Sequence, residues 1–215
     1  NGLLYVRGQP QDFDHWRQLG NTGWSWNDVL PYFRRAENWE GPAAEERGVG
    51  GPLNVSANKV DREIVEAWLE AATAAGYRRT VDYNREDQEG VGYFQMTMKN
   101  GRRCSSAAAY LKPARKRSNL HIFTNAHSEK LLIDGNDVTG VRCKIQGKSV
   151  DISARREVIL SAGTIGSPQL LMLSGIGDAA ELRPHGIDVL HQLSGVGKNL
   201  QDHLQARPVF KCRAS

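Results

Sequence analysis

The sequence predicts a mixed α/β fold, in which helices and loops fill the N-terminal half and an antiparallel meander leads into a buried strand in the C-terminal half. Three observations predict it. Apolar residues recur at helical spacing in two early stretches, short strand-like segments follow Asn119, and an apolar run ends in small residues at Ser161 to Gly163. With 215 residues, of which 40% are hydrophobic, the chain can form one large domain or two small ones around a real core.

The first helix is predicted by "SWNDVLPYFRRAENW", where Ser25 or Asn27 can cap it and the helix ends near Glu37. Pro31 is tolerated because it lies close to the first turn. Its apolar face is predicted to hold Val29, Leu30 and Phe33. The following residues 40–52, "EGPAAEERGVGGP", consist of Gly, Pro and charged residues and predict a surface loop.

A second helix is predicted by "NKVDREIVEAWLEAATAAGY", with Asp61 near its N-cap and Gly76 as its stop. Its predicted packing face holds Ile64, Trp68, Leu69 and Ala72. Further on, "YFQMTM" alternates as a strand that "KNG" turns, and Ser105 or Ser106 can cap a short helix that Pro113 interrupts or ends.

From Asn119 onward the pattern changes to short strands separated by glycine turns. The predicted strands are "NLHIFTNA", "EKLLIDG", "DVTGVRCKIQG", "SVDISA" and "EVILSAG". The change of period near Ser118 is the most natural internal boundary. The last of these strands would need a partner sheet that the remaining residues barely supply.

The stretch "REVILSAGTIGSPQLLMLSGIG" predicts a buried parallel strand over Val158 to Leu160, a small-residue turn, and a helix from about Pro168 to Ser174 that Ser167 caps. Such turns at the carboxyl ends of parallel strands often bind cofactors, although many only connect two elements. "GIGDAA", 175–180, matches a dinucleotide pattern but follows a helix, so we reject it as a fingerprint. "GVGKNL", 195–200, reads as a loop.

Composition excludes several classes of protein. The three cysteines are far apart and form no C-x-x-C pair, which argues against a disulfide framework or a zinc site and favours a reducing compartment. No apolar run is long enough for a membrane span, and the first residues do not resemble a signal peptide. A formal net charge of +4 is too small for a dense nucleic-acid-binding face, and the basic run "KPARKR" reads as a solvated helix end.

Residues 163–177 fit the second signature of the glucose-methanol-choline (GMC) family of flavin oxidoreductases, and the sequence as a whole resembles that family. The segments "NGLLYVRGQPQDFDHW", "GWSWNDVLPYF", "GPLNVS", "SSAAAYLKPA" and "GVGKNLQDH" follow in the family's usual order. The resemblance is greatest to bacterial alcohol and choline dehydrogenases. It implies FAD as the cofactor and a fragment of a two-domain oxidoreductase, with part of a Rossmann-like FAD domain and a substrate domain that has an antiparallel sheet.

The resemblance also implies a division of the chain. Residues 1–118 would form a mainly helical and loop region that joins the two domains, 119–177 would hold the meander, strand and helix of the FAD domain, and 178–215 would cross into the substrate domain. This arrangement corresponds to the middle of a family member. The pyrophosphate-binding glycine loop would then precede Asn1, and the catalytic His would follow Ser215, so no catalytic residue is assigned here.

Several FAD contacts carry over from the family to matching positions. The implied cofactor-binding residues are Asn1, Gly2, Ser128, Ser161, Ala162 and Gly163. Ser128 matches a position whose backbone meets the adenine, and Ser161 to Gly163 match a strand end against the adenosine half. The implied reaction moves a hydride from an alcohol carbon to the flavin while a His accepts the hydroxyl proton.

His203 and Gln205, in "LQDHLQA", are the implied substrate-pocket residues. Choline-using relatives tend to have Glu where this chain has Gln205, and a carboxylate there would suit a quaternary ammonium. The departure favours an uncharged primary alcohol, although it does not exclude choline. We expect the other five histidines to be ordinary surface or structural residues: His15, His121, His127, His185 and His191.

The remaining expectations concern binding partners and cellular location. They are a small alcohol as substrate, an unidentified electron acceptor, no metal, no nucleic acid, a homo-oligomer as one option, and a cytoplasmic location with membrane association only through the acceptor. A different class also stays open at this point: a stand-alone, non-catalytic chain that keeps pieces of the fold and binds a small ligand or a partner. That alternative predicts no flavin.

Overall fold

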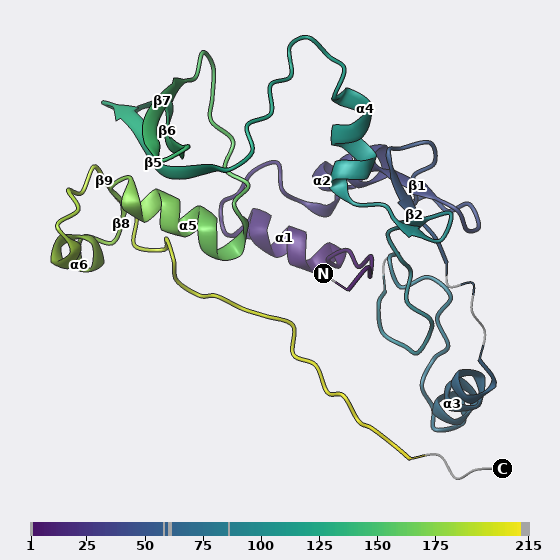
Figure 1. Cartoon of the computed structure of the whole chain (residues 1–215). Coiled ribbons are helices and arrows are strands. Elements are labelled where there is room, and N and C mark those ends of the chain that lie inside the picture. Colours follow the sequence, from purple (N-terminus) through teal and green to yellow (C-terminus); the bar gives the residue numbers. More distant parts are fainter. Residues whose placement is uncertain (1, 58, 60–61, 86, 212–215) are drawn as a thin grey trace. The chain divides into compact units, whose positions relative to one another are not determined.

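The computed structural model describes residues 2–57, 59, 62–85 and 87–211 (Figure 1). The chain divides into two compact units, 1–121 and 122–215, close to the change of pattern near Ser118. The first unit holds α1 (Pro10–Gln18), α2 (Trp26–Ala36), β1 (Glu37–Trp39), β2 (Leu53–Val55), α3 (Glu63–Ala74), β3 (Met98–Lys99), β4 (Arg102–Arg103), the π-helix η1 (Ala107–Leu111) and α4 (Lys112–Ala114). The second holds β5 (Ala126–Asp134), β6 (Asp137–Ile145), β7 (Lys148–Ser153), α5 (Gly163–Leu173), β8 (Ile176–Gly177), α6 (Ala179–Leu182), the 3₁₀ helix η2 (Arg183–His185) and β9 (His191–Gln192).

Helix α2 confirms the first predicted helix. The Ser25 hydroxyl accepts the backbone N–H of Asp28, and the Asp28 carboxylate accepts the N–H of Ser25, so both ends of a capping box are made. Helix α1 packs against α2 through Phe13, whose ring centroid lies 5.7 Å from that of Trp26. Aromatic packing therefore joins these two helices at the N-terminal end of the unit.

Helix α3 lies where the second helix was predicted, but most of its predicted packing face is wrong. Leu69 is only 1% exposed, whereas Ile64 and Trp68 are more than half exposed. The physical reason is that no other described helix or strand packs extensively against α3, so Leu69 is its one buried residue. Gly76 ends the helix at φ +97°, as predicted, and Asp61 falls outside the described residues.

The predicted surface loop 40–52 is partly buried, which corrects that expectation. It joins β1 to β2, which pair in parallel, and it brings Glu46, Arg47 and Gly48 into the interior. A Cβ on Gly48 would lie 1.9 Å from the carbonyl oxygen of Arg34, so only glycine fits there. Only this part of the segment is buried against α2 and β1, and Arg47 is tolerated there because it pairs with the Glu37 carboxylate.

The predicted strand "YFQMTM" is mostly irregular. The structure retains only bridges at Met96 and the short β3, which the Asn100–Gly101 turn joins to β4 as predicted. In the next segment, Ser105 accepts the N–H of Ala108, and the helix continues from η1 into α4 through Pro113.

The meander was predicted from the glycine turns and is confirmed as the antiparallel sheet β5-β6-β7. Gln146 and Gly147 both have positive φ, at 50° and 80°, which is the backbone of a type I′ hairpin turn. One predicted strand is wrong: residues 119–125 of "NLHIFTNA" are irregular, and β5 begins only at Ala126. No described strand lies beside 119–125 to accept backbone hydrogen bonds.

The predicted buried strand over Val158 to Leu160 is also wrong. These residues form no strand, and Ile159 is 77% exposed, because no described strand of the second unit lies beside them. The helix that follows begins earlier than predicted, at Gly163, and contains Pro168. Ser167 therefore does not cap it. Its hydroxyl instead accepts the backbone N–H of Ala162 before the helix.

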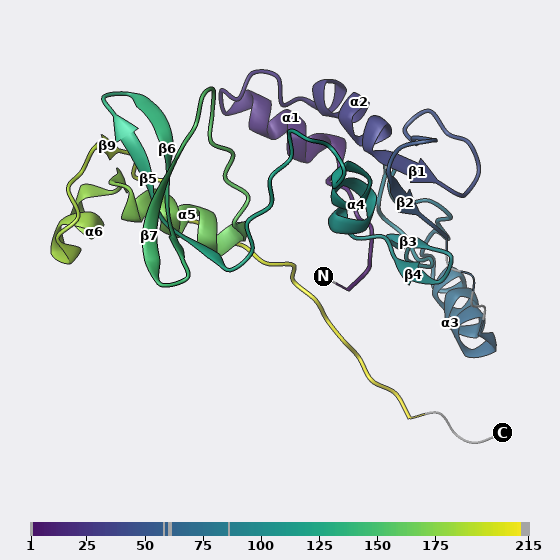
Figure 2. The same cartoon turned by 45° about the horizontal axis from the view of Figure 1, so that its top comes forward.

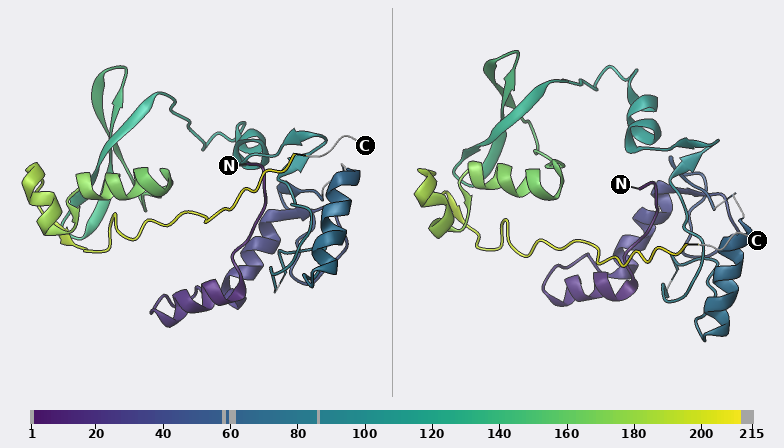
Figure 3. Two further views of the ribbon diagram at one scale, coloured as in Figure 1. Left: turned by 90° about the horizontal axis from the view of Figure 1, so that it is seen from below. Right: turned by 60° about the horizontal axis from the view of Figure 1, so that its bottom comes forward.

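The last segment of the second unit is extended from Leu200 to Lys211, without helix or strand (Figure 3). "GVGKNL" is a loop, as predicted. The combination of helices, a meander and short parallel pairs confirms the mixed fold class. Within the described ranges, no helix combines the length and apolar character that a membrane span requires.

Candidate cofactor-binding site

Helix α5 is anchored to the meander by one buried hydroxyl. The Ser174 Oγ accepts the backbone N–H of Leu131 in β5 at 2.8 Å and donates to the carbonyl oxygen of Leu170 at 2.6 Å. Leu131 and Leu170 are both buried at this contact. Figure 2 shows α5 lying against the sheet. The C-terminal end of α5 is therefore fixed to β5. The position of its N-terminal end follows from the direction of the helix.

That N-terminal end carries the predicted turn Ser161, Ala162 and Gly163, all exposed. Gly163 has φ +87°, and a Cβ there would meet no atom within 4 Å, so the space beside it is open. No side chain caps the helix and no acidic residue lies in its first turn. Uncapped backbone N–H groups and the positive end of the helix dipole suit a polar or anionic group of a cofactor.

Ser128 lies near the start of β5, at an irregularity of the sheet. Ser128 pairs with Cys143 and Lys130 pairs with Arg142, so Glu129 is one extra residue on its strand. A bulge of this kind disrupts the ladder locally and leaves backbone groups free of their regular partners. The implied role of Ser128, a backbone contact to adenine, is compatible with that geometry.

The two parts of the candidate site lie toward the same end of the second unit. Strand β5 and helix α5 run in the same general direction (Figures 1 and 3), so their N-terminal ends face the same side. The structure therefore places Ser128 and the turn from Ser161 to Gly163 at the same end of the packed pair formed by β5 and α5. The residues present fit the adenosine portion of FAD, because they offer small side chains, open space and backbone donors.

The other predicted site residues are not assembled with these. Asn1 falls outside the described residues, and Gly2 is exposed in the first unit. His203 and Gln205 are exposed in the extended segment, where the Gln205 amide oxygen accepts from Arg207. The five remaining histidines are all exposed, as expected. In the described part of the chain no group of His, Cys, Asp and Glu could hold a metal ion.

A buried charge cluster in the first unit was missed by sequence reasoning. The Glu37 carboxylate lies 2.7 Å from the Arg7 guanidinium and 2.9 Å from that of Arg47, and all three side chains are buried. Asp82 lies 3.4 Å from Arg47. Burial lowers the pKa of Arg47, and the charges of Glu37 and Asp82 oppose this shift. No local pattern could reveal the cluster, because its members come from four separate segments.

The GMC oxidoreductase family matches residues 1–205, which is nearly the whole chain. The chain belongs to the GMC oxidoreductase family. Its sequence is 50% identical over 212 residues to the oxygen-dependent choline dehydrogenase of Brucella ovis, covering 99% of this chain and 38% of that relative.

Solved structures of GMC-like enzymes share the fold. Pyridoxine 4-oxidase from Mesorbium loti matches with a TM-score of 0.87 and 32% identity, over 94% of this chain and 40% of that chain. An FAD-dependent oxidoreductase from Chaetomium thermophilum matches with the same TM-score and identity, over 94% of this chain and 37% of that chain. The family and cofactor predictions are confirmed: this is GMC oxidoreductase sequence, and FAD is the cofactor of such proteins.

Proposed function

We propose that this chain forms part of an FAD-dependent oxidoreductase that oxidises a primary alcohol. The observation that carries the proposal is the uncapped, exposed turn at Gly163 on a helix that is fixed to β5, in a chain of the GMC oxidoreductase family. FAD, when bound, supplies the hydride acceptor. The chain spans 38% of the length of its curated Brucella relative, so the activity is proposed for the protein of which these residues are a part.

The residues of this chain have a binding role in that proposal. The backbone beside Ser128 and the turn from Ser161 to Gly163 would hold the adenosine half of FAD, and the family resemblance assigns Asn1 and Gly2 to the flavin ring. The buried contact between Leu131 and Ser174 keeps α5 in place. No catalytic residue is proposed within residues 1–215, and the proton-accepting base is proposed to lie outside them.

The finer proposal on substrate rests on Gln205. An amide at this position gives no negative charge to balance a quaternary ammonium, which favours an uncharged primary alcohol. Choline is a second candidate, and the 50% identity to a choline dehydrogenase favours it. The electron acceptor, a homo-oligomeric state and a cytoplasmic location stay predictions.

FAD binding by the complete gene product that contains these residues tests the cofactor role directly. We expect flavin fluorescence to change on titration with this complete protein and a Gly163→Val variant to lose most of the change, because a branched side chain would fill the open space and strain φ +87°. Gly135→Val is the matched control, since Gly135 also has positive φ and open space but lies in the β5-β6 turn. A complete and folded gene product that leaves flavin fluorescence unchanged would support the stand-alone, non-catalytic alternative instead.

The substrate is tested in the complete gene product that contains these residues. If the uncharged-alcohol proposal holds, kcat/KM for a short primary alcohol exceeds that for choline, and Gln205→Glu shifts the ratio toward choline. A higher kcat/KM for choline in the wild-type protein would reject this finer proposal in favour of the second candidate, without affecting the FAD assignment.

A further inference from the structure

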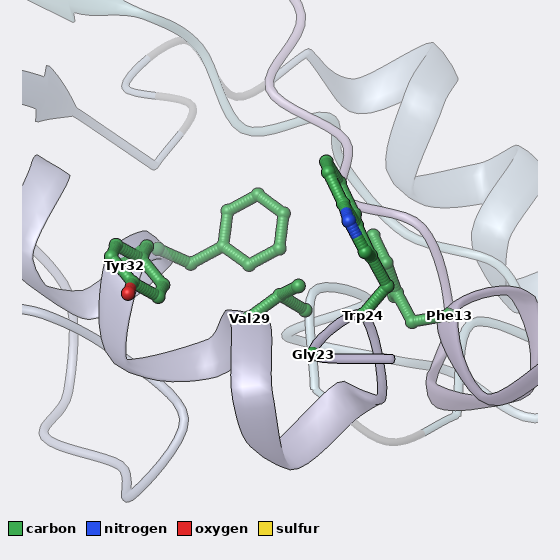
Figure 4. Close-up of a pocket in the computed structure, with 6 residues that line it drawn as sticks. Phe13, Gly23, Trp24, Val29 and Tyr32 are labelled. Atoms are coloured by element: carbon green, nitrogen blue, oxygen red, sulfur yellow. The ribbon is translucent and has the colours of Figure 1, made fainter. Parts of the chain in front are cut away.

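A cavity of about 570 Å³ lies between α1 and α2 in the first unit (Figure 4). This volume is within the roughly 300 to 1,000 Å³ typical of small-ligand sites. Figure 4 shows Trp24 and Phe13 on one side, Tyr32 on the other, and Val29 between them at the base. Its lining is Phe13, Gly23, Trp24, Val29, Tyr32 and Phe33. None of these residues belongs to the set assigned to FAD.

Contacts between neighbouring aromatic rings support the walls of this cavity. The Phe13 ring lies 5.4 Å from that of Trp16 and 5.7 Å from that of Phe33, and Trp16 lies 5.7 Å from Trp24, all at steep interplanar angles. Phe13 is buried, whereas Trp24 is 51% and Tyr32 63% exposed. The cluster therefore supports Trp24, a large ring that remains open to a ligand, which favours stacking against a planar aromatic group.

The groups that lie over the rings of the cavity lining are cationic. All six lining residues are uncharged, and a guanidinium group lies over each of two of their rings. The Cζ atom of Arg7 lies 5.1 Å from the ring centroid of Phe33, and that of Arg35 lies 5.0 Å from the ring centroid of Tyr32. Arg7 is neutralised by Glu37. Arg35 is exposed and forms no ion pair with any residue that the structure describes. Arg35 is thus an uncompensated positive charge beside Tyr32, although it does not itself line the cavity.

The nearby carboxylates do not offset it. On α1, Asp12 accepts the backbone N–H of Gln9 and Asp14 accepts that of Trp26. On α2, Asp28 accepts from the backbone and hydroxyl of Ser25. These groups complete helix ends and the contact between the two helices, and none lines the cavity. A cationic ligand would find ring faces that guanidinium groups already occupy and no carboxylate in the lining.

We propose that this cavity binds a planar aromatic molecule that carries an anionic group, with its ring stacked on Trp24 and its anion beside Arg35. Arginine is suited to this role because its guanidinium can bind a carboxylate while it stacks on Tyr32. The ligand class differs from both substrate candidates above, since neither choline nor a short alcohol has an aromatic ring or a negative charge. The inference does not depend on FAD binding.

Three probes that share one ring and differ only in charge test this proposal by isothermal titration calorimetry on the full chain. They are 1-naphthoate, 1-naphthylmethanol and (1-naphthylmethyl)trimethylammonium. We expect 1-naphthoate to bind most tightly. Arg35→Gln should weaken it by up to about fivefold, the range for an exposed charge pair, whereas Arg34→Gln, which removes a neighbouring exposed charge, should leave it unchanged.

A second test fills the cavity with a larger side chain. Val29→Trp should abolish 1-naphthoate binding while the circular dichroism spectrum stays that of the wild type. If this variant does not fold, Trp24→Ala replaces it, because removal of the exposed ring should weaken binding of all three probes. Equal or tighter binding of the ammonium probe, or 1-naphthoate binding that neither Arg35→Gln nor the cavity variant changes, would overturn the proposal.

Discussion

Glu37 and Arg47 form an ion pair in which neither side chain is exposed, with 2.9 Å between Oε1 and Nη2. The other carboxylate oxygen of Glu37 accepts from Arg7 at 2.7 Å and from the backbone N–H of Gly48 at 2.9 Å. One carboxylate at the end of α2 thus holds the N-terminal segment and the β1-β2 loop together. The buried guanidinium groups of Arg7 and Arg47 both use this carboxylate as a negative counter-charge.

Removal of that carboxylate is expected to be strongly destabilising. Glu37→Gln should lower the free energy of unfolding by about 3 to 5 kcal/mol, because Arg7 and Arg47 would remain buried without an adequate counter-charge. Urea unfolding followed by circular dichroism measures the change. Asp151→Asn is the control, since Asp151 pairs with Arg142 on the exposed face of the meander and its loss should have a far smaller effect. Equal losses in the two variants would contradict this account.

The close approach at Gly48 gives a second prediction. Gly48→Ala would place a Cβ 1.9 Å from the carbonyl oxygen of Arg34, and backbone atoms must move to admit it. We expect a loss of about 1 to 3 kcal/mol in the free energy of unfolding, the usual cost of overpacking. Gly195→Ala, where a Cβ would meet no atom within 4 Å, should be neutral or slightly stabilising. A neutral Gly48→Ala would show that this loop yields easily.

The anchor of α5 can be tested with one hydroxyl. Ser174→Ala leaves the buried N–H of Leu131 without its acceptor, so we expect a loss of about 1 to 3 kcal/mol in unfolding free energy. Ser153→Ala, at an exposed position of β7, serves as the control and should change little. If FAD binds, Ser174→Ala should also weaken it, because α5 would position Gly163 less well. Unchanged stability would mean that Leu131 finds another partner.

The sequence predicts local structure well where the signal is local. The capping box of Ser25 with Asp28 and the turn of Gln146 with Gly147 are both set by neighbouring residues, and both helix and hairpin are confirmed. The helix α5 shows the limit of this reasoning. Ser167 and Pro168 mark a helix start by local rules, yet α5 begins at Gly163.

Long-range partners explain the remaining misses. The apolar run from Val158 to Leu160 has the composition of a buried strand, but a strand exists only where another strand accepts its hydrogen bonds, and none does among the described residues. The same reasoning applies to Arg47, whose loop looks hydrophilic until Glu37 and Arg7 are brought beside it. The Ser128 bulge has no local sequence signal either, because it depends on the register with β6.

Tyr83 should make stability depend on pH in the alkaline range. Burial raises the pKa of Tyr83 above its ordinary value of 10.0, and the backbone N–H of Gln95, which its hydroxyl accepts at 2.7 Å, only partly opposes the shift. Above pH 10.0 the unfolded chain therefore loses a proton that the folded chain retains, so the free energy of unfolding falls as pH rises. The contribution is complete below that pH and is lost as the pH passes through the folded-state pKa.

Tyr83→Phe separates this effect from simple packing. The variant should lose about 1 kcal/mol at neutral pH, because the hydroxyl also donates to the carbonyl of Tyr5 at 2.9 Å. Its stability should then decline less steeply than that of the wild type above about pH 10. Some slope should remain, since burial also raises the pKa of Tyr5. Urea unfolding at a series of alkaline pH values measures both slopes. Parallel curves for the two proteins would show that Tyr83 does not govern the alkaline loss of stability, and the effect would then have to arise at Tyr5 or at another group.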